Sequence, residues 1–356
     1  MAMRVGIVGA GFAGLAAAIA FRQNGHDVTV FERAAGPLVA GGAIALAPNA
    51  LACLSILGIN DQIVTQPWSR MPATVRTPDG RVLVRRTLAQ LTGGDEFAAV
   101  PRAELIAWLA ARLPAQCVQY GCGVTAASAD GFVAVDGDTR RFDLVVGADG
   151  ARGVTRRLVF PDAPPLRSTG ISGWAWIVDR ELSGGFGPIW GRTADFGILP
   201  LTDGRTYVYG SRSGESDLGS FRGWAHPLPA LIDAATPDRL ITPEIFEARP
   251  PRRLVRGKVV LIGDAAHTMR PTFGQGAALA MEDALTLAYR GTPGLSRRWL
   301  RMMALYGLSK AGSRFATPGY ATLETARNLG LRLVPDPVFG IMAGSVSRWR
   351  PRLYER

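Results

Sequence analysis

The 356-residue chain has few of the side chains on which disulfide frameworks, metal clusters and nucleophilic catalysis depend. It has three cysteines, an odd number without a C-x-x-C pair, and three histidines, none near a cysteine in the sequence. A disulfide framework and a clustered metal site are therefore disfavoured, and we expect a reducing, cytoplasmic setting. A G-x-S-x-G motif is also missing, so a hydrolase of that type would lack its nucleophile.

Charge is sparse and of one prevailing sign. Only 19% of the residues are charged, and the formal net charge of +11 comes almost entirely from arginine, since Lys258 and Lys310 are the only lysines. The basic residues are spread along the chain without a block of interleaved aromatics, which argues against a nucleic-acid partner. Such a field attracts anions, nucleotide cofactors among them.

A long uninterrupted apolar run is missing as well. The run from Val5 to Phe21 is the nearest to one, but glycines at motif spacing interrupt it, which excludes a signal peptide or transmembrane segment there. With 47% hydrophobic residues, the chain can fill the cores of two lobes.

The N-terminus predicts a β-α-β unit. Arg4 to Val8 reads as a buried strand, Leu15 to Asn24 as an alanine-rich helix and Asp27 to Glu32 as a second strand. About 30 residues in this order are typical of the nucleotide-binding half of a doubly wound α/β fold.

The turn of this unit carries the sequence G-x-G-x-x-G. Gly9 permits the tight turn, Gly11 lets a pyrophosphate approach the backbone, and Gly14 lets the helix pack on the strand. Glu32 ends the second strand, where its carboxylate can accept bonds from ribose hydroxyls and would repel a 2'-phosphate. The site fits FAD or NAD; the alternative is an ordinary buried glycine turn beside a solvated glutamate.

The middle of the chain predicts a second sheet. Trp68 to Val84 alternates apolar and polar residues around the turn Pro78-Asp79-Gly80, as in a hairpin. A helix is expected from Arg102 to Leu113, followed by strands at Gly131 to Val135 and Phe142 to Val146. From Leu166 to about Arg249 the pattern is all strand and turn, and we expect a substrate-binding sheet there. Its large aromatic residues include Trp174, Trp176, Trp190, Phe196, Tyr207, Tyr209 and Trp224.

The last third returns to the nucleotide domain. Lys258 to Gly263 is expected to be a buried strand that leads into a glycine-rich loop. A helix follows from Ala277 to Tyr289, and the rest of the chain is expected to be mostly helical.

Three motifs of this region, taken together, resemble those of a known protein family. The sequences Gly263-Asp264-Ala265-Ala266-His267, Pro271 to Ala278 and Met281-Glu282-Asp283-Ala284 resemble the class A flavoprotein monooxygenases of the para-hydroxybenzoate hydroxylase fold. The resemblance extends to Gly41-Gly42-Ala43, to Pro48 to Leu51, to Arg102 and to Gly147-Ala148-Asp149-Gly150 with Arg156. It spans most residues up to about 290 and departs from the family at Gly153, where serine is more common.

The resemblance implies an α/β fold with a Rossmann-like FAD-binding domain, an interleaved mixed β-sheet substrate domain and C-terminal helices. We assign the FAD-binding domain to residues 1–70, 98–160 and 250–300, the substrate domain to 71–97 and 161–249, and the C-terminal helical segment to 301–356. Asp264 would hold a ribityl hydroxyl of FAD. The full set of residues expected to bind the cofactor is Gly9, Gly11, Ala13, Gly14, Glu32, Arg33, Ala43, Arg102, Val124, Asp149, Asp264, Gly274, Gln275, Gly276 and Ala277.

The implied reaction is a hydroxylation or epoxidation of a small aromatic or electron-rich substrate. NADH or NADPH would reduce the flavin, and O2 would add to give a C4a-hydroperoxide that passes one oxygen to the substrate. If the substrate is a phenol, a Tyr or His would deprotonate it, and Arg212 could pair with a carboxylate. The residues expected to line the substrate cavity are Trp176, Tyr207, Tyr209, Arg212 and Pro271.

Three other functions stay open from the sequence. A flavin reductase that does not use O2 would carry the same flavin motifs. A flavin halogenase is suggested by Trp174-Ala175-Trp176-Ile177, although such enzymes use an active-site lysine near the N-terminal domain, and this chain has only Lys258 and Lys310. A binding or escort module without turnover is the third. The chain is expected to act as a monomer or homodimer.

Overall fold

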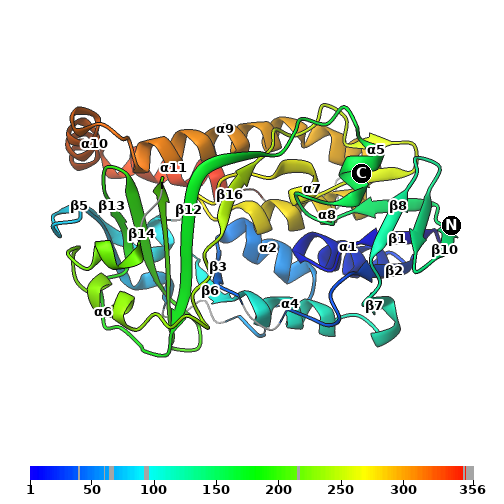
Figure 1. Cartoon of the computed structure of the whole chain (residues 1–356), viewed down its shortest axis with the longest axis horizontal. Coiled ribbons are helices and arrows are strands. Elements are labelled where there is room, and N and C mark those ends of the chain that lie inside the picture. Colours follow the sequence, from blue (N-terminus) through cyan, green and yellow to red (C-terminus); the bar gives the residue numbers. More distant parts are fainter. Residues whose placement is uncertain are drawn as a thin grey trace.

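The computed structural model describes residues 1–38, 41–59, 61–63, 68–91, 96–214, 217–347 and 349. Two sheets, each with its own helices, lie side by side along the long axis of the molecule (Figure 1). The long helix α9 (Trp299–Ala316) runs along both of them. The fold class expected from the sequence, α/β with mixed sheets and C-terminal helices, is confirmed.

The first sheet has six strands in the order β17-β18-β11-β1-β2-β7. Its central strands are parallel and almost wholly buried, as expected when both faces of a sheet are covered. The predicted strands Arg4 to Val8 and Asp27 to Glu32 are confirmed. The strands are β1 (Arg4–Val8), β2 (Asp27–Glu32), β7 (Val118–Tyr120), β11 (Leu144–Gly147), β17 (Val255–Arg256) and β18 (Val259–Leu261).

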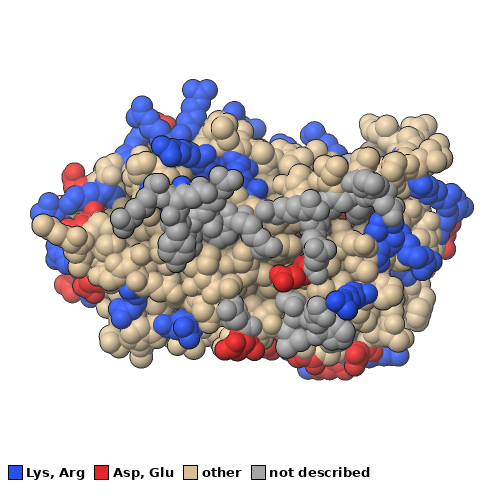
Figure 2. Space-filling model, turned by 180° about the vertical axis from the view of Figure 1, so that it is seen from behind, with Lys and Arg blue, Asp and Glu red and all other residues tan. Residues whose placement is uncertain are grey.

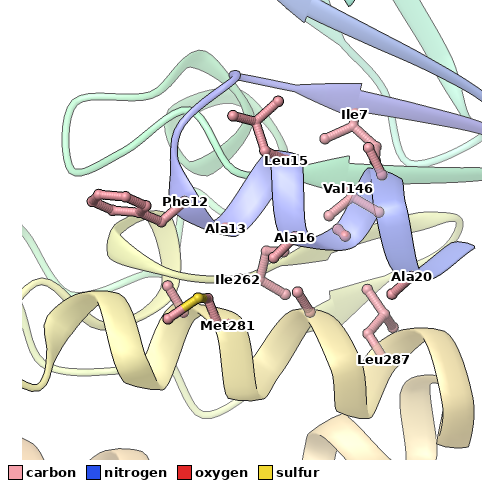
Figure 3. Packing of buried hydrophobic residues seen from close by; sticks show 14 of the residues in the cluster. Ile7, Phe12, Ala13, Leu15, Ala16, Ala20, Val146, Ile262, Met281 and Leu287 are labelled. Atoms are coloured by element: carbon pink, nitrogen blue, oxygen red, sulfur yellow. The ribbon is translucent and has the colours of Figure 1, made fainter. Parts of the chain in front are cut away.

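Helix α1 (Phe12–Gln23) is the centre of this half's core. It begins three residues earlier than the sequence pattern indicated, within the glycine motif itself. Figure 3 shows it packed between sheet residues such as Ile7 and Val146 and helix α8, with Met281 and Leu287 on the far side. Its alanines let the two helices approach closely, and larger side chains there would cost about 1–3 kcal/mol through overpacking.

The second sheet has seven strands in the order β16-β12-β15-β14-β13-β4-β5. The hairpin predicted around Pro78-Asp79-Gly80 is confirmed, and it joins the strands of the aromatic segment through a parallel contact between Ile189 and Arg76. The strands are β4 (Pro72–Arg76), β5 (Val82–Thr87), β12 (Arg167–Val178), β13 (Gly187–Trp190), β14 (Ala194–Pro200), β15 (Thr206–Ser213) and β16 (Glu244–Glu247).

One face of this sheet is covered by two short helical segments, η3 (Leu218–Phe221) and α6 (Leu228–Asp233). The prediction that residues 166–249 contain only strands and turns was therefore wrong. Leu228, Leu231 and Ile232 have the i, i+3, i+4 spacing of a helix face and are buried against the sheet. A six-residue helix with a proline at its start is easily read as a turn.

Two small sheets and several short helices complete the fold. A three-stranded sheet is formed by β8 (Val124–Ala127), β9 (Phe132–Val135) and the unpredicted β10 (Asp138–Arg141). Strand β3 (Ala43–Leu46) pairs with β6 (Ala98–Pro101) and lies between the two large sheets. The short helices are α2 (Pro48–Ile56), α3 (Leu88–Leu91), α4 (Arg102–Ala111), α5 (Val154–Val159), α7 (Asp264–His267), η1 (Trp68–Arg70) and η2 (Ala115–Cys117).

The C-terminal part is helical, as predicted. Helix α8 (Gly276–Arg297) is interrupted at Gly291, whose φ of 63° and ψ of −169° are not helical. Helices α9, α10 (Ala321–Leu333) and α11 (Asp336–Ser347) follow. In the described part of the chain, no helix combines the length and apolarity needed to cross a membrane.

Basic residues are spread over the surface, as they are along the sequence. On the face in Figure 2, Lys and Arg form several separate groups with Asp and Glu among them, and broad areas carry no charge.

Candidate active site

The glycine turn after β1 contains glycines with two different roles. A Cβ added at Gly14 would lie 1.8 Å from the carbonyl oxygen of Gly9, and one added at Gly9 would lie 2.6 Å from that of Ala148. These two positions therefore exclude a side chain for packing reasons. A Cβ on Gly11 would meet no atom of the described chain within 4 Å, so space is left at the N-terminus of α1.

Glu32 lies beside this open space. Its carboxylate accepts hydrogen bonds from the Ala10 N–H at 2.8 Å and from the Ala34 N–H at 2.9 Å. A carboxylate has about four acceptor positions, so the half-buried side chain can still bind further donors. Arg33 follows it on the surface, and Val124 begins the neighbouring strand β8.

Arg102 reaches the same place from α4. Its guanidinium carbon lies 5.3 Å from the ring centre of Phe12, the residue that follows Gly11. The Arg102 side chain is exposed. The Arg102 N–H donates to the carbonyl of Gly42 at 2.9 Å, which fixes the start of α4 against the chain that leads into β3.

Asp264 stands at the end of β18, near the glycine turn. The preceding Gly263 has a positive φ of 59°, and a Cβ there would lie 2.7 Å from the Cβ of Ala13, so strand and helix are in close contact. The Asp264 carboxylate is exposed, and no hydrogen-bond or ionic partner for it exists among the described residues. An ionised carboxylate in this position is free to accept bonds from ligand hydroxyls.

The loop from Pro271 to Gly276 precedes the 22-residue helix α8. A Cβ on Gly276 would meet nothing within 4 Å among the described residues, and one on Gly274 would lie 3.7 Å from the Ala45 Cβ. The Gln275 side chain turns inward and accepts a bond from the Asn49 amide at 2.8 Å. The first backbone N–H groups of α8 therefore lie near β3. Ala277 is in the first turn of this helix.

These residues fit FAD. Two glycines with open space above them, an exposed guanidinium and two carboxylates with free acceptor positions are brought to one edge of the first sheet. The N-termini of α1 and α8 also favour negative charge there. The guanidinium and the helix N-termini can bind a pyrophosphate and an anionic ring, and the carboxylates can bind ribose hydroxyls.

Asp149 has a different environment. Both of its carboxylate oxygens accept bonds from Thr155, one from the backbone N–H at 2.9 Å and one from the hydroxyl. Burial raises the pKa of Asp149, although these bonds oppose the shift. A Cβ on Gly153 would lie 2.2 Å from the Asp149 carboxyl carbon, so glycine at this position is what allows Asp149 to cap α5.

The second sheet turns a polar face toward β3. We call this the tyrosine face; it consists of Asp195 and Gly197 on β14 and of Tyr207, Tyr209 and Ser211 on β15. The ring centres of the two tyrosines are 5.8 Å apart. A Cβ added at Gly42, the residue before β3, would lie 3.1 Å from the Tyr207 hydroxyl, so this face contacts the chain that leads into β3.

Both tyrosines are held in their neutral form. Burial raises the pKa of Tyr207 to about 12, although Ala43 and Arg102 oppose the shift. Burial, with the Asp195 carboxylate adding to it, raises the pKa of Tyr209 further. The two hydroxyls are therefore hydrogen-bond donors at neutral pH, and the expectation that a tyrosine deprotonates the substrate is not supported.

Trp176 and Arg212 lie on the opposite face of the sheet. The Trp176 side chain is 1% exposed and its indole N–H donates to the Leu231 carbonyl at 2.9 Å. The Arg212 guanidinium carbon lies 5.9 Å from the Phe221 ring centre. Because side chains alternate along strands, neither residue is brought together with Tyr207 and Tyr209, and we no longer expect them to line the substrate cavity.

Pro271 is exposed in the loop before α8. Its carbonyl accepts the Gly274 N–H at 2.8 Å, which shapes the loop. The side chains of Thr272 and Phe273 face Gly312 of α9, since a Cβ there would lie 2.5 Å from Phe273. Pro271 is thus near the cofactor loop, and Tyr207 and Tyr209 approach the same region from the second sheet through β3.

The sequence did not indicate a buried ionic network behind the cofactor loop. Asp283 pairs with His267 at 2.6 Å and with Arg298 at 2.9 Å. Burial opposes ionisation, but His267 and Arg298 hold the pKa of Asp283 below its usual value. Glu282 accepts a hydrogen bond from the Asn49 side-chain amide at 2.7 Å. Since Asn49 also donates to Gln275, the network reaches the loop before α8. In the described ranges, no three His, Cys, Asp or Glu side chains are arranged to hold a metal ion.

The fold and the site define a dinucleotide-binding protein whose second sheet contacts the chain that leads into β3. Comparison with known proteins agrees. A family model described as "FAD binding domain" matches residues 2–183 and 242–290. The FAD-dependent urate hydroxylase of Klebsiella pneumoniae is 33% identical over 309 residues, 80% of each chain. The 2-heptyl-3-hydroxy-4(1H)-quinolone synthase of Pseudomonas aeruginosa is 34% identical over 315 residues, also 80% of each chain.

A solved structure is similar over nearly the whole chain. The crystal structure of Klebsiella pneumoniae HpxO complexed with FAD and uric acid has a TM-score of 0.86 and 28% identity, and the match covers 98% of this chain and 97% of that one. The chain therefore belongs to the family of FAD-binding-domain proteins and, within it, to the FAD-dependent monooxygenases. The resemblance to class A flavoprotein monooxygenases is confirmed.

Proposed function

We propose that this monooxygenase hydroxylates a small, electron-rich aromatic or heteroaromatic substrate bound between the tyrosine face and the loop before α8. The observation that carries the proposal is the close approach of Tyr207 to Gly42, where an added Cβ would lie 3.1 Å from the Tyr207 hydroxyl. Because the Gly42 carbonyl also accepts the Arg102 N–H, this contact joins the second sheet to the side on which Arg102 and the glycine loop lie. The names of relatives support the substrate class, since they specify urate, a quinolone and 3-amino-4-hydroxybenzoate.

Bound FAD would supply the redox chemistry, taking electrons from NADH or NADPH and activating O2. The chain's own residues would do the binding and positioning. Glu32 would hold the ribose, Arg102 and the N–H groups near Gly11 the pyrophosphate, and Asp264 a ribityl hydroxyl. The start of α8 would stabilise negative charge on the ring. We assign these tasks to segments 1–70, 98–160 and 250–300, and substrate binding to 71–97 and 161–249.

The protein's part in the reaction is orientation and the exclusion of water. Tyr207 and Tyr209 stay protonated at neutral pH and would donate hydrogen bonds to oxygen or nitrogen acceptors of the substrate. A ring bound between the tyrosine face and the loop before α8 would be withdrawn from bulk solvent. The apolar rings also give an aromatic ligand surface to stack on.

The test is turnover of the purified, FAD-loaded full chain with NADH or NADPH, O2 and a panel of phenols and heteroaromatics. We expect nicotinamide oxidation stimulated by a panel member and a product heavier by one oxygen. In Tyr209→Phe the KM of that substrate should rise about 5- to 10-fold, as for one lost hydrogen bond, whereas exposed Tyr320→Phe should match the wild type.

The outcomes separate the alternatives. A substrate reduced by NADH or NADPH without O2 would make the chain a reductase, and a chloride-dependent product would make it a halogenase. Oxygenated product with an unchanged Tyr209→Phe enzyme would refute the tyrosine face as the binding surface while leaving the activity intact.

A further inference from the structure

The tyrosine face carries one acidic group, Asp195, that neither the cofactor site nor the core explains. It lies on β14 directly opposite Ser211 of β15, whose hydroxyl donates to one of its carboxylate oxygens. The side chain is half-buried, and burial raises the pKa of Asp195 to about 6. Besides Ser211, only its own backbone N–H opposes the effect of burial among the described residues, and a carboxylate in such a place is costly unless a further donor completes it.

The protein itself does not provide that donor. Within the described ranges, no arginine, lysine or histidine pairs with Asp195. On the β13 side, Arg327 donates to the backbone carbonyls of Trp190, Gly191 and Ala316 and pairs with Glu324 instead. On the β15 side stand the two neutral tyrosines, with Arg102 beyond Tyr207.

Other charged groups near this end of the sheet are already neutralised. Glu247 of β16 pairs with Arg270 at 2.8 Å and with Lys310 of α9 at 2.8 Å. Arg212 of β15 is on the other face of the sheet. Asp195 is therefore the one group on the tyrosine face that changes charge near neutral pH.

The position of Asp195 along the face also matters. Strand pairing aligns Tyr207 with Leu199, Tyr209 with Gly197 and Ser211 with Asp195. These three pairs form successive rows of side chains on the tyrosine face, and the Asp195 row is the second one beyond the Tyr207 row in the direction away from β3. At about 3.3 Å per residue, two rows of two residues correspond to roughly 13 Å. The Tyr209 ring lies over Gly197, where a Cβ would come within 2.1 Å, so the aromatic surface leads from Tyr207 to the carboxylate.

We propose that Asp195 is a specificity-determining residue whose carboxylate accepts a hydrogen bond from a nitrogen-borne N–H at the end of the substrate remote from β3. This inference rests on the proposed function, because it assumes that the substrate binds on the tyrosine face. The preferred substrates are then aromatics that carry an amine or a ring N–H. Aromatic carboxylates are rejected, because their charge would be placed against an unneutralised acid.

The experiment uses three phenols of similar size on the FAD-loaded full chain: tyramine, a cation; 4-(2-hydroxyethyl)phenol, which is neutral; and 4-hydroxyphenylacetate, an anion. Their Kd values at pH 7.5 are read from changes in the visible absorbance of the bound flavin. We expect tyramine to bind at least about 10-fold more tightly than the neutral phenol, and the anion most weakly.

Asp195→Asn tests the residue directly. Tyramine should lose about 10- to 100-fold in affinity, as for one charge-assisted bond, and the neutral phenol less than 3-fold. Asp179→Asn is the matched control, since Asp179 follows β12 and makes an exposed ion pair with Arg239. Unchanged flavin spectra and thermal unfolding would show that both variants fold.

The wild type gives a second measurement that needs no substitution. Because a bound ammonium favours ionised Asp195, tyramine affinity should be full above about pH 6 and fall as the pH decreases below it. The neutral phenol should bind equally across this range. Both results together would support the assignment.

Two failures are distinguishable. If all three phenols perturb the flavin with similar Kd values, if the anion binds best, or if Asp195→Asn keeps the preference for tyramine, the role of Asp195 is refuted and the proposed function stands. If none of the three perturbs the flavin while the enzyme still oxygenates another aromatic, the tyrosine face is not the binding surface, and the inference falls with it.

Discussion

The substitution Gly11→Ala separates cofactor binding from folding. Gly11 has φ −79° and ψ −172°, a conformation open to alanine, and an added Cβ would meet no described atom within 4 Å. The apoprotein should therefore unfold at the same denaturant concentration or be stabilised by about 0.4–1 kcal/mol, the usual effect of replacing glycine at a compatible position.

The affinity for FAD should decrease instead. The methyl group would occupy the space through which the pyrophosphate approaches the backbone, at the cost of one or more charge-assisted hydrogen bonds. Each is worth about 1.5–3 kcal/mol, so we expect the Kd for FAD to rise by about 10- to 150-fold. The assay is titration of the apoprotein with FAD, followed by quenching of flavin fluorescence, alongside urea unfolding of the apoprotein.

Gly14→Ala is the matched control in the same turn. Its Cβ would lie 1.8 Å from the Gly9 carbonyl oxygen, so this variant should lose apoprotein stability whether or not FAD is present. Wild-type FAD affinity in Gly11→Ala, or a loss of apoprotein stability as large as that of Gly14→Ala, would refute the assignment of the open space to the cofactor.

Two further predictions concern stability. Asp283→Asn removes the buried carboxylate that pairs with His267 and Arg298, although Arg298 keeps Glu282, and should cost about 3–5 kcal/mol in urea unfolding at pH 7. Because the pKa of Asp283 is lower folded than unfolded, its contribution is present above the unfolded pKa of about 3.9 and is lost as the pH falls through the folded value; a deficit that shrinks already at pH 6 would contradict this. Gly153→Ser should push Asp149 off the start of α5 and cost about 1–2 kcal/mol, measured by thermal unfolding; an unchanged midpoint would contradict the cap.

The nucleotide half could be predicted because its signals are local. Gly9, Gly14 and Glu32 lie within one β-α-β unit, and each has a steric or hydrogen-bonding reason to be there that short-range spacing expresses. The break of α8 at Gly291 falls just past Tyr289, where the sequence pattern already ended the helix.

The substrate side could not be predicted to the same depth. Which face a residue occupies depends on strand register, so Trp176 and Tyr207 looked equivalent in sequence although the sheet separates them. Asp195 gave no signal beyond a single acid in an apolar strand. The bond between Asn49 and Glu282 joins residues 233 positions apart, and no local pattern encodes such a contact.

As a monooxygenase, the chain is expected to insert one atom of O2 into an aromatic substrate. The most direct test is turnover of the FAD-loaded enzyme under 18O2 with the best substrate of the panel, followed by mass spectrometry of the product. We predict one 18O atom per product molecule, and none when the label is supplied as H2(18)O. Label from water, or nicotinamide oxidation that yields only hydrogen peroxide with every aromatic of the panel, would contradict the account.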